Sequence, residues 1–106
     1  MSNLSPQHAM VLNSIPIGHA NAIRRDALSR ALGMRDREVR DVIEQLICLH
    51  HPVCNLGDGK GYFRPGSIDE LRRYIAYNAS YKKKLMKKEY HLKRAMESFD
   101  TIPMDF

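Results

Sequence analysis

The chain has 106 residues, of which 43% are hydrophobic and 27% are charged, so it is long enough for one compact domain with a modest core. It contains no apolar stretch near the ~20 residues that cross a bilayer and no signal-peptide pattern at its start, which favours a cytoplasmic protein and disfavours a membrane partner. The formal net charge of +5 favours a polyanionic partner, although such a charge also serves plain solubility.

The start of the chain predicts one short helix followed by a break. Ser5 and Pro6 are typical of an N-cap and a first helical residue, so a helix is expected over residues 8–12. Residues 21–23 are expected to be briefly extended.

A second and a third helix are expected on either side of a tight turn. Residues 25–32 place apolar side chains on one helical face, and Gly33 suits the left-handed residue at which many helices end. Asp36 is expected to cap a third helix that extends to about His50. This helix has one polar face and one apolar stripe, which comprises Val39, Val42, Ile43, Leu46, Ile47 and Leu49.

Two short strands are expected next. Residues 52–55 and 62–64 flank a glycine-rich turn at residues 57–61, a pattern that predicts a β-hairpin. The fold class is therefore mainly α with a small β-hairpin.

The two cysteines lie beside two histidines in the order Cys48, His50, His51 and Cys54. Zinc binds such ligands, but the usual pair of closely spaced cysteines is missing. We interpret both cysteines as buried free thiols, and we expect no metal and no cofactor.

A long basic helix is expected over residues 67–99. Ser67 and Glu70 form a capping box at its start. Along it, a seam with a seven-residue repeat predicts a homodimer; its members are Leu71, Asn78, Leu85, Leu92 and Phe99. Lys82 and Glu89 interrupt the companion positions of this seam. The alternative is that only the first turns pack on the core and the remainder is a solvated amphipathic helix.

The same helix carries nine Lys and Arg and four Asp and Glu, an excess equal to the net charge of the whole chain. We expect this charge to attract phosphates, and binding to weaken steeply with salt. The candidate phosphate contacts on this helix are Lys82, Lys83, Lys84, Lys87 and Lys88.

Residues 27–43 resemble the helix-turn-helix core of the winged-helix superfamily, and residues 61–63 resemble its returning wing strand. The capping-box entry into a long C-terminal helix is similar to that of small winged-helix proteins of phages and prophages. The resemblance covers roughly residues 8–75. It implies a winged helix-turn-helix domain at residues 1–66. The remaining sequence pattern predicts a long basic helix at 67–99 and a flexible tail at 100–106.

The resemblance also implies that the third helix enters the major groove of DNA. Arg35, Arg37 and Arg40 would then reach base edges. The remaining candidate contacts, to phosphate or the minor groove, are Arg24, Arg25, Arg30 and Lys60. Acidic residues share this face, so two helical pairs, Arg37 with Asp41 and Arg40 with Glu44, offer the alternative of a neutralised solvated surface.

The sequence thus predicts a DNA-binding winged-helix protein of a bacterial cell or phage-infected host, a transcriptional regulator or a phage replication accessory factor. No phosphate loop, nucleophile elbow or metal motif is present, and no enzymatic activity is expected. The alternative is a protein-interaction module that grips an acidic protein or a ribonucleoprotein, such as an anti-CRISPR-like phage inhibitor of host machinery.

Overall fold

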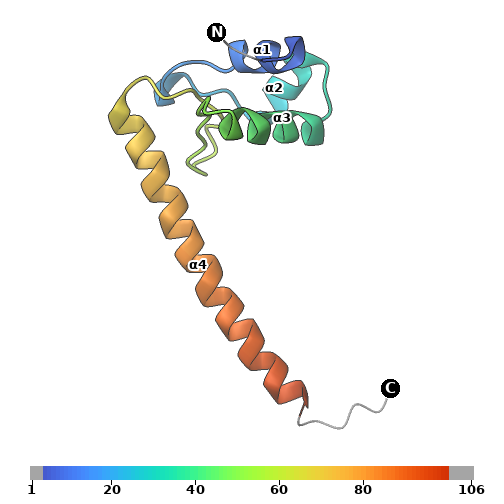
Figure 1. Ribbon diagram of the computed structural model, residues 1–106, viewed down its shortest axis with the longest axis vertical. Helices are drawn as coiled ribbons and strands as arrows, with labels where there is room; N and C mark the ends of the chain where they lie inside the picture. The colour runs from blue at the N-terminus through green and yellow to red at the C-terminus, as the bar shows by residue number, and fades with distance from the viewer. Residues whose placement is uncertain (1–3, 101–106) are drawn as a thin grey trace. The chain divides into compact units, whose positions relative to one another are not determined.

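The computed structural model describes residues 4–100, with side chains as far as Glu97, and is mainly α-helical (Figure 1). Its elements in chain order are α1 (Pro6–Asn13), a 3₁₀ helix η1 (His19–Asn21), α2 (Arg25–Leu32), α3 (Asp36–Cys48) and α4 (Ile68–Asp100). Contacts divide the chain into one unit that ends at Tyr74 and a second that begins at Ile75. No helix within the described residues has the length and apolar character to cross a membrane.

Helix α1 begins where its capping signal lies. The Ser5 hydroxyl accepts a hydrogen bond from the His8 backbone N–H at 3.1 Å, and Pro6 is the first helical residue. The helix is therefore slightly longer than predicted. Of the expected extended segment 21–23, the first residue belongs to η1 and only Ile23 makes a bridge.

The turn between α2 and α3 forms as predicted. Helix α2 has the expected bounds, and Gly33 adopts φ 62° and ψ 28°, the left-handed conformation. The backbone N–H of Met34 donates to the Ser29 carbonyl at 3.1 Å, which closes the end of α2. The chain can thus reverse within three residues.

The predicted N-cap of α3 is wrong. Arg35 holds the cap position without a side-chain capping bond, and Asp36 is the first helical residue. The Asp36 carboxylate instead lies 2.8 Å from Arg25 Nε and 3.5 Å from Arg40 Nε. Arg25, from α2, thus binds the carboxylate that was expected to cap α3. The local sequence around Asp36 does not reveal this partner.

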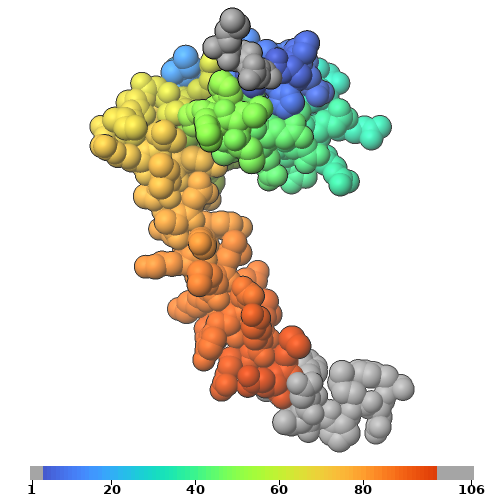
Figure 2. Space-filling model, in the orientation of Figure 1, coloured from blue at the N-terminus to red at the C-terminus, as the bar shows by residue number. Residues whose placement is uncertain are grey.

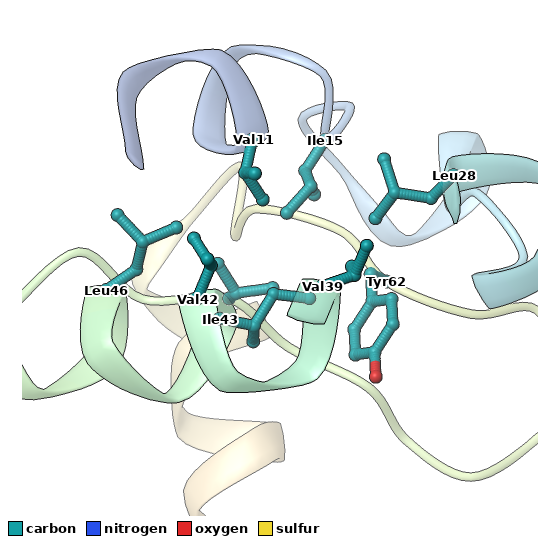
Figure 3. Packing of buried hydrophobic residues seen from close by; sticks show 9 residues of the cluster. Val11, Ile15, Leu28, Val39, Val42, Ile43, Leu46 and Tyr62 are labelled. Carbon is teal, nitrogen blue, oxygen red and sulfur yellow. The ribbon is translucent and has the colours of Figure 1, made fainter. Parts of the chain in front are cut away.

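The core of the first unit lies where α1, α2 and α3 meet (Figure 3). Its fully buried side chains include Val11, Ile15, Leu28, Val39 and Leu46. The predicted stripe of α3 is too wide, because Ile47 and Leu49 are 39% and 49% exposed. Both lie at the end of the helix, beyond the arc that faces α1.

The predicted β-hairpin is reduced to isolated bridges, and residues 4–100 contain no β-strand. Tyr62 exchanges two backbone hydrogen bonds with Ile23, at 2.8 and 2.9 Å. The next residue, Phe63, exchanges two with Cys54, at 2.8 and 3.0 Å. Adjacent residues of the returning segment direct their backbone groups to opposite sides, as in a central strand, but each pairing stops after a single bridge and no strand forms.

Helix α4 confirms the expectation of a long C-terminal helix. The Ser67 hydroxyl accepts from the Glu70 N–H at 3.2 Å, one half of the predicted capping box. The other half differs, since the Glu70 carboxylate accepts from the N–H groups of Gly66 at 2.8 Å and His19 at 3.1 Å. The Phe99 side chain and residues 101–106, most of the expected tail, lie outside the described residues.

Candidate nucleic-acid interface

An open hollow of about 900 Å³ lies between α2, the start of α3 and the glycine-rich loop 55–61. It brings together three of the predicted DNA-contacting arginines of the first unit. Its lining residues are Arg24, Arg25, Asp26, Ser29, Arg30, Asp36, Asn55, Gly57, Gly59 and Gly61.

Two aspartates neutralise part of this arginine group. Asp26 lies 3.5 Å from both Arg24 and Arg30, and Asp36 is shared between Arg25 and Arg40. All these side chains are at least 41% exposed, so water screens the pairs and each contributes little. Four guanidinium groups face two carboxylates, which leaves an excess of positive charge.

The helical pairs that the sequence allowed on α3 do not form. Arg40 contacts Asp36, one turn before it, instead of Glu44, one turn after it. Arg37 forms no ion pair with any residue in the described part of the chain, whereas Arg35 lies 3.8 Å from Glu38. Arg37 is exposed and is thus the α3 arginine most available to a ligand.

Two local hydrogen bonds and one tertiary contact shape the glycine-rich loop. The Asp58 carboxylate accepts from the Lys60 backbone N–H at 3.0 Å and lies 2.7 Å from His19 Nε2. The Asn55 side chain accepts from the Gly57 N–H at 2.9 Å. The Lys60 side chain is exposed but does not line the hollow.

Hydrogen-bond donors lower the pKa of two carboxyl groups near this loop. The Lys60 N–H and then the His19 side chain hold the pKa of Asp58 below its usual value. The N–H groups of Gly66 and His19 do the same for the pKa of Glu70. Sequence reasoning missed His19, Asn55 and Asp58 as organisers of the loop, and only the turn-forming character of Asn55 and Asp58 pointed to them.

The cysteines differ in their surroundings. Cys54 is buried, and desolvation followed by the charge of Glu70 raises its pKa to about 11. Cys48 is exposed, so the prediction that both are buried is wrong for this residue, which ends α3 on its outer side. Among the described residues, no group of three or more His, Cys, Asp or Glu side chains is placed to hold a metal ion.

The second unit carries the predicted lysines and most of the predicted seam. The five lysines from Lys82 to Lys88 are exposed and form no ion pair within the described residues. Asn78, Leu85 and Leu92 are also exposed, whereas Leu71, in the first unit, is half-buried.

Comparisons of the chain with protein-family models, with curated proteins and with solved structures give no match.

Proposed function

We propose that this chain is a DNA-binding winged-helix protein without enzymatic activity, and that it serves as a transcriptional regulator or a phage replication accessory factor. The observation that carries the proposal is the hollow between α2, α3 and loop 55–61, where arginines outnumber carboxylates. Helices α2 and α3 around Gly33 form the helix-turn-helix in this proposal. The bridged segments 52–55 and 62–64 form a minimal wing.

A DNA phosphate fits the chemistry of this hollow. Arginine binds phosphate through paired N–H donors, and Arg25 and Arg30 are at present engaged only by exposed carboxylates. Giving up such pairs costs about 0.2–1 kcal/mol each. Gly57 and Gly59 also line the hollow, beside Asn55, so the DNA backbone would meet mostly main chain on the loop.

Base recognition falls to the first half of α3 in this proposal. Arg37 is exposed and forms no ion pair with the described residues, so its guanidinium is available for the O6 and N7 atoms of guanine. Arg35 and Arg40 lie one turn or less away on the same helix. The lysines of α4 add attraction that does not depend on base sequence.

The test is duplex DNA binding at several salt concentrations, with a preferred site selected from a random library. We expect Arg25→Ala and Arg30→Ala to weaken binding to preferred and random duplexes alike and to reduce the salt slope by about one each. Arg37→Ala should lower affinity for the preferred site by about 1–3 kcal/mol and spare random DNA. Arg72→Ala, an exposed arginine on α4 paired with Asp69, is the matched control.

A folded sample that binds no duplex at low salt would refute the proposal. Equal losses for Arg37→Ala on both duplexes would refute base recognition and leave phosphate binding in place.

A protein-interaction module, such as an anti-CRISPR-like inhibitor, is the second candidate, and one observation favours it. A second hollow of about 540 Å³ is lined by Asp41, Glu44 and Leu49, so the outer face of α3 carries negative charge beside apolar surface. Such a face repels DNA phosphates and suits a protein. Absence of a gel shift together with binding to a host protein complex would favour this candidate.

A further inference from the structure

One face of α4 carries exposed apolar side chains in the second unit. Ile75, Leu85, Leu92 and Met96 are 60%, 47%, 60% and 63% exposed. Figure 2 shows this part of α4, in orange, with its side chains projecting from the helix. Together with Leu71, these residues belong to a stripe with alternating steps of three and four residues, the spacing of a coiled-coil seam, whose other members are Asn78, Lys82 and Glu89.

An isolated helix of this kind is only marginally stable in water. An exposed apolar stripe of this length is typical of a surface that binds another protein segment. Two charged residues within the stripe, Lys82 and Glu89, identify that partner. They have opposite charge and lie one seven-residue repeat apart, so in a reversed second copy each comes within one turn of the oppositely charged residue.

A parallel pair of α4 helices would be electrostatically unfavourable. Lys82 would face Lys82 of the second copy, and Glu89 would face its own equivalent. At the flanking positions, Lys88 would lie beside Lys93 of the second copy. Like charges at these positions oppose association.

We propose that residues 71–96 of two copies pair as an antiparallel coiled coil. In this register Leu71 packs against Met96 of the second copy, and Ile75 packs against its Leu92. Asn78 then faces Glu89 of the second copy, and Lys82 lies one turn from that same carboxylate. Leu85 packs against the aliphatic part of Lys82 of the second copy, and the other apolar members of the stripe pack against one another.

Most of the rest of the helix surface is compatible with this arrangement, and the exception is Arg72, which lies beside Lys93 of the second copy. Lys83, Lys84 and Lys87 fall at positions that face away from the partner, which leaves them free for another ligand. Tyr81 lies beside Lys88 of the second copy, where an aromatic face favours a cation. The Glu89 carboxylate lies 3.1 Å from Lys93 Nζ of its own helix. This exposed ion pair contributes little to stability, so replacing it with the contacts of the dimer costs little free energy. The proposal does not depend on DNA binding.

Cross-linking distinguishes the two directions of pairing. In a Cys48→Ser background, Ile75→Cys and Leu92→Cys proteins are treated with a short bismaleimide, separately and as a mixture. The antiparallel register predicts a cross-linked dimer only in the mixture, because the two copies of residue 75 are about 25 Å apart along the axis. The background protein, whose remaining Cys54 is buried, is the control.

Cross-linked dimers from either single variant alone would show parallel pairing and overturn the proposal. A monomeric mass in solution at high protein concentration would also overturn it, and would point to a different chain or to this chain's own first unit as the partner of the stripe.

Charge reversal gives an independent measurement by sedimentation equilibrium. Lys82→Glu and Glu89→Lys should each raise the dimer Kd about fivefold, and the double variant should restore it. Leu85→Ala should raise the dimer Kd more than tenfold by removing a buried side chain. Charge reversals that leave the Kd unchanged, while Leu85→Ala raises it, would contradict the antiparallel register.

Discussion

Substitution of Gly61 by alanine probes the join between the glycine-rich loop and the arginine-bearing segment. Gly61 has φ +101°, and an added Cβ would lie 2.0 Å from the Ile23 carbonyl oxygen and 2.7 Å from Arg24 Cα. The obstructing atoms are backbone atoms, so they cannot rotate away as a side chain would. The Ile23–Tyr62 bridge must therefore open, and Arg24, which lines the hollow, moves with Ile23.

The structure sets the size of the effect. Backbone strain at this φ costs about 1–3 kcal/mol for a non-glycine residue. Loss of the two hydrogen bonds between Ile23 and Tyr62 adds about 1 kcal/mol each, so Gly61→Ala should reduce the free energy of unfolding by about 3–5 kcal/mol. Gly33→Ala is the matched control. Its Cβ would meet no atom within 4 Å, and strain alone costs about 1–2 kcal/mol.

Urea unfolding followed by circular dichroism measures both variants, and thermal melts check the result, since 1 kcal/mol shifts Tm by about 4–8 °C in a domain of this size. The free energy of unfolding of Gly33→Asn should stay close to that of the wild type, because asparagine tolerates the left-handed region. If Gly61→Ala proves no more destabilising than Gly33→Ala, the close approach of loop 55–61 to residues 23–24 is refuted.

Two further predictions concern the titratable groups. Cys48 should react with a thiol reagent in the native protein at pH 7. Cys54 is buried and has a pKa of about 11, so it should react only after denaturation, as labelling and mass spectrometry would show. Fast labelling of Cys54 in the native protein would contradict its burial. Asp58 and Glu70 have lowered pKa values in the folded state, so their contribution to stability is present above the ordinary carboxyl pKa of about 4 and is lost as the pH falls through the folded values. The urea concentration at the unfolding midpoint should therefore decrease as the pH is lowered from 5 to about 3. In a double Asp58→Asn, Glu70→Gln variant this decrease should be smaller. An equal decrease of the midpoint in both proteins would argue against these hydrogen bonds.

The helices were predictable because their signals are local. Apolar spacing in residues 25–32 and the need for a left-handed residue at Gly33 depend only on neighbours along the chain. The same holds for the start of α4, where Ser67 caps the helix.

The partners of charged residues were not predictable in the same way. Local spacing allowed Arg40 to pair with Glu44, but Asp36 attracts both Arg40 and an arginine from α2. The loop tether between His19 and Asp58 joins residues far apart in sequence. Such contacts depend on which segments meet in space.

The sequence by itself determined where the long elements lie, how the positive charge is distributed and which repeat runs along α4, because periodicity, capping and charge are properties of short stretches of chain. Tertiary structure alone decided that the expected hairpin became isolated bridges, that Ile47 and Cys48 face outward, and that a hollow separates the arginines from the glycine-rich loop. These outcomes depend on long-range packing, because they follow from which distant segments meet in space.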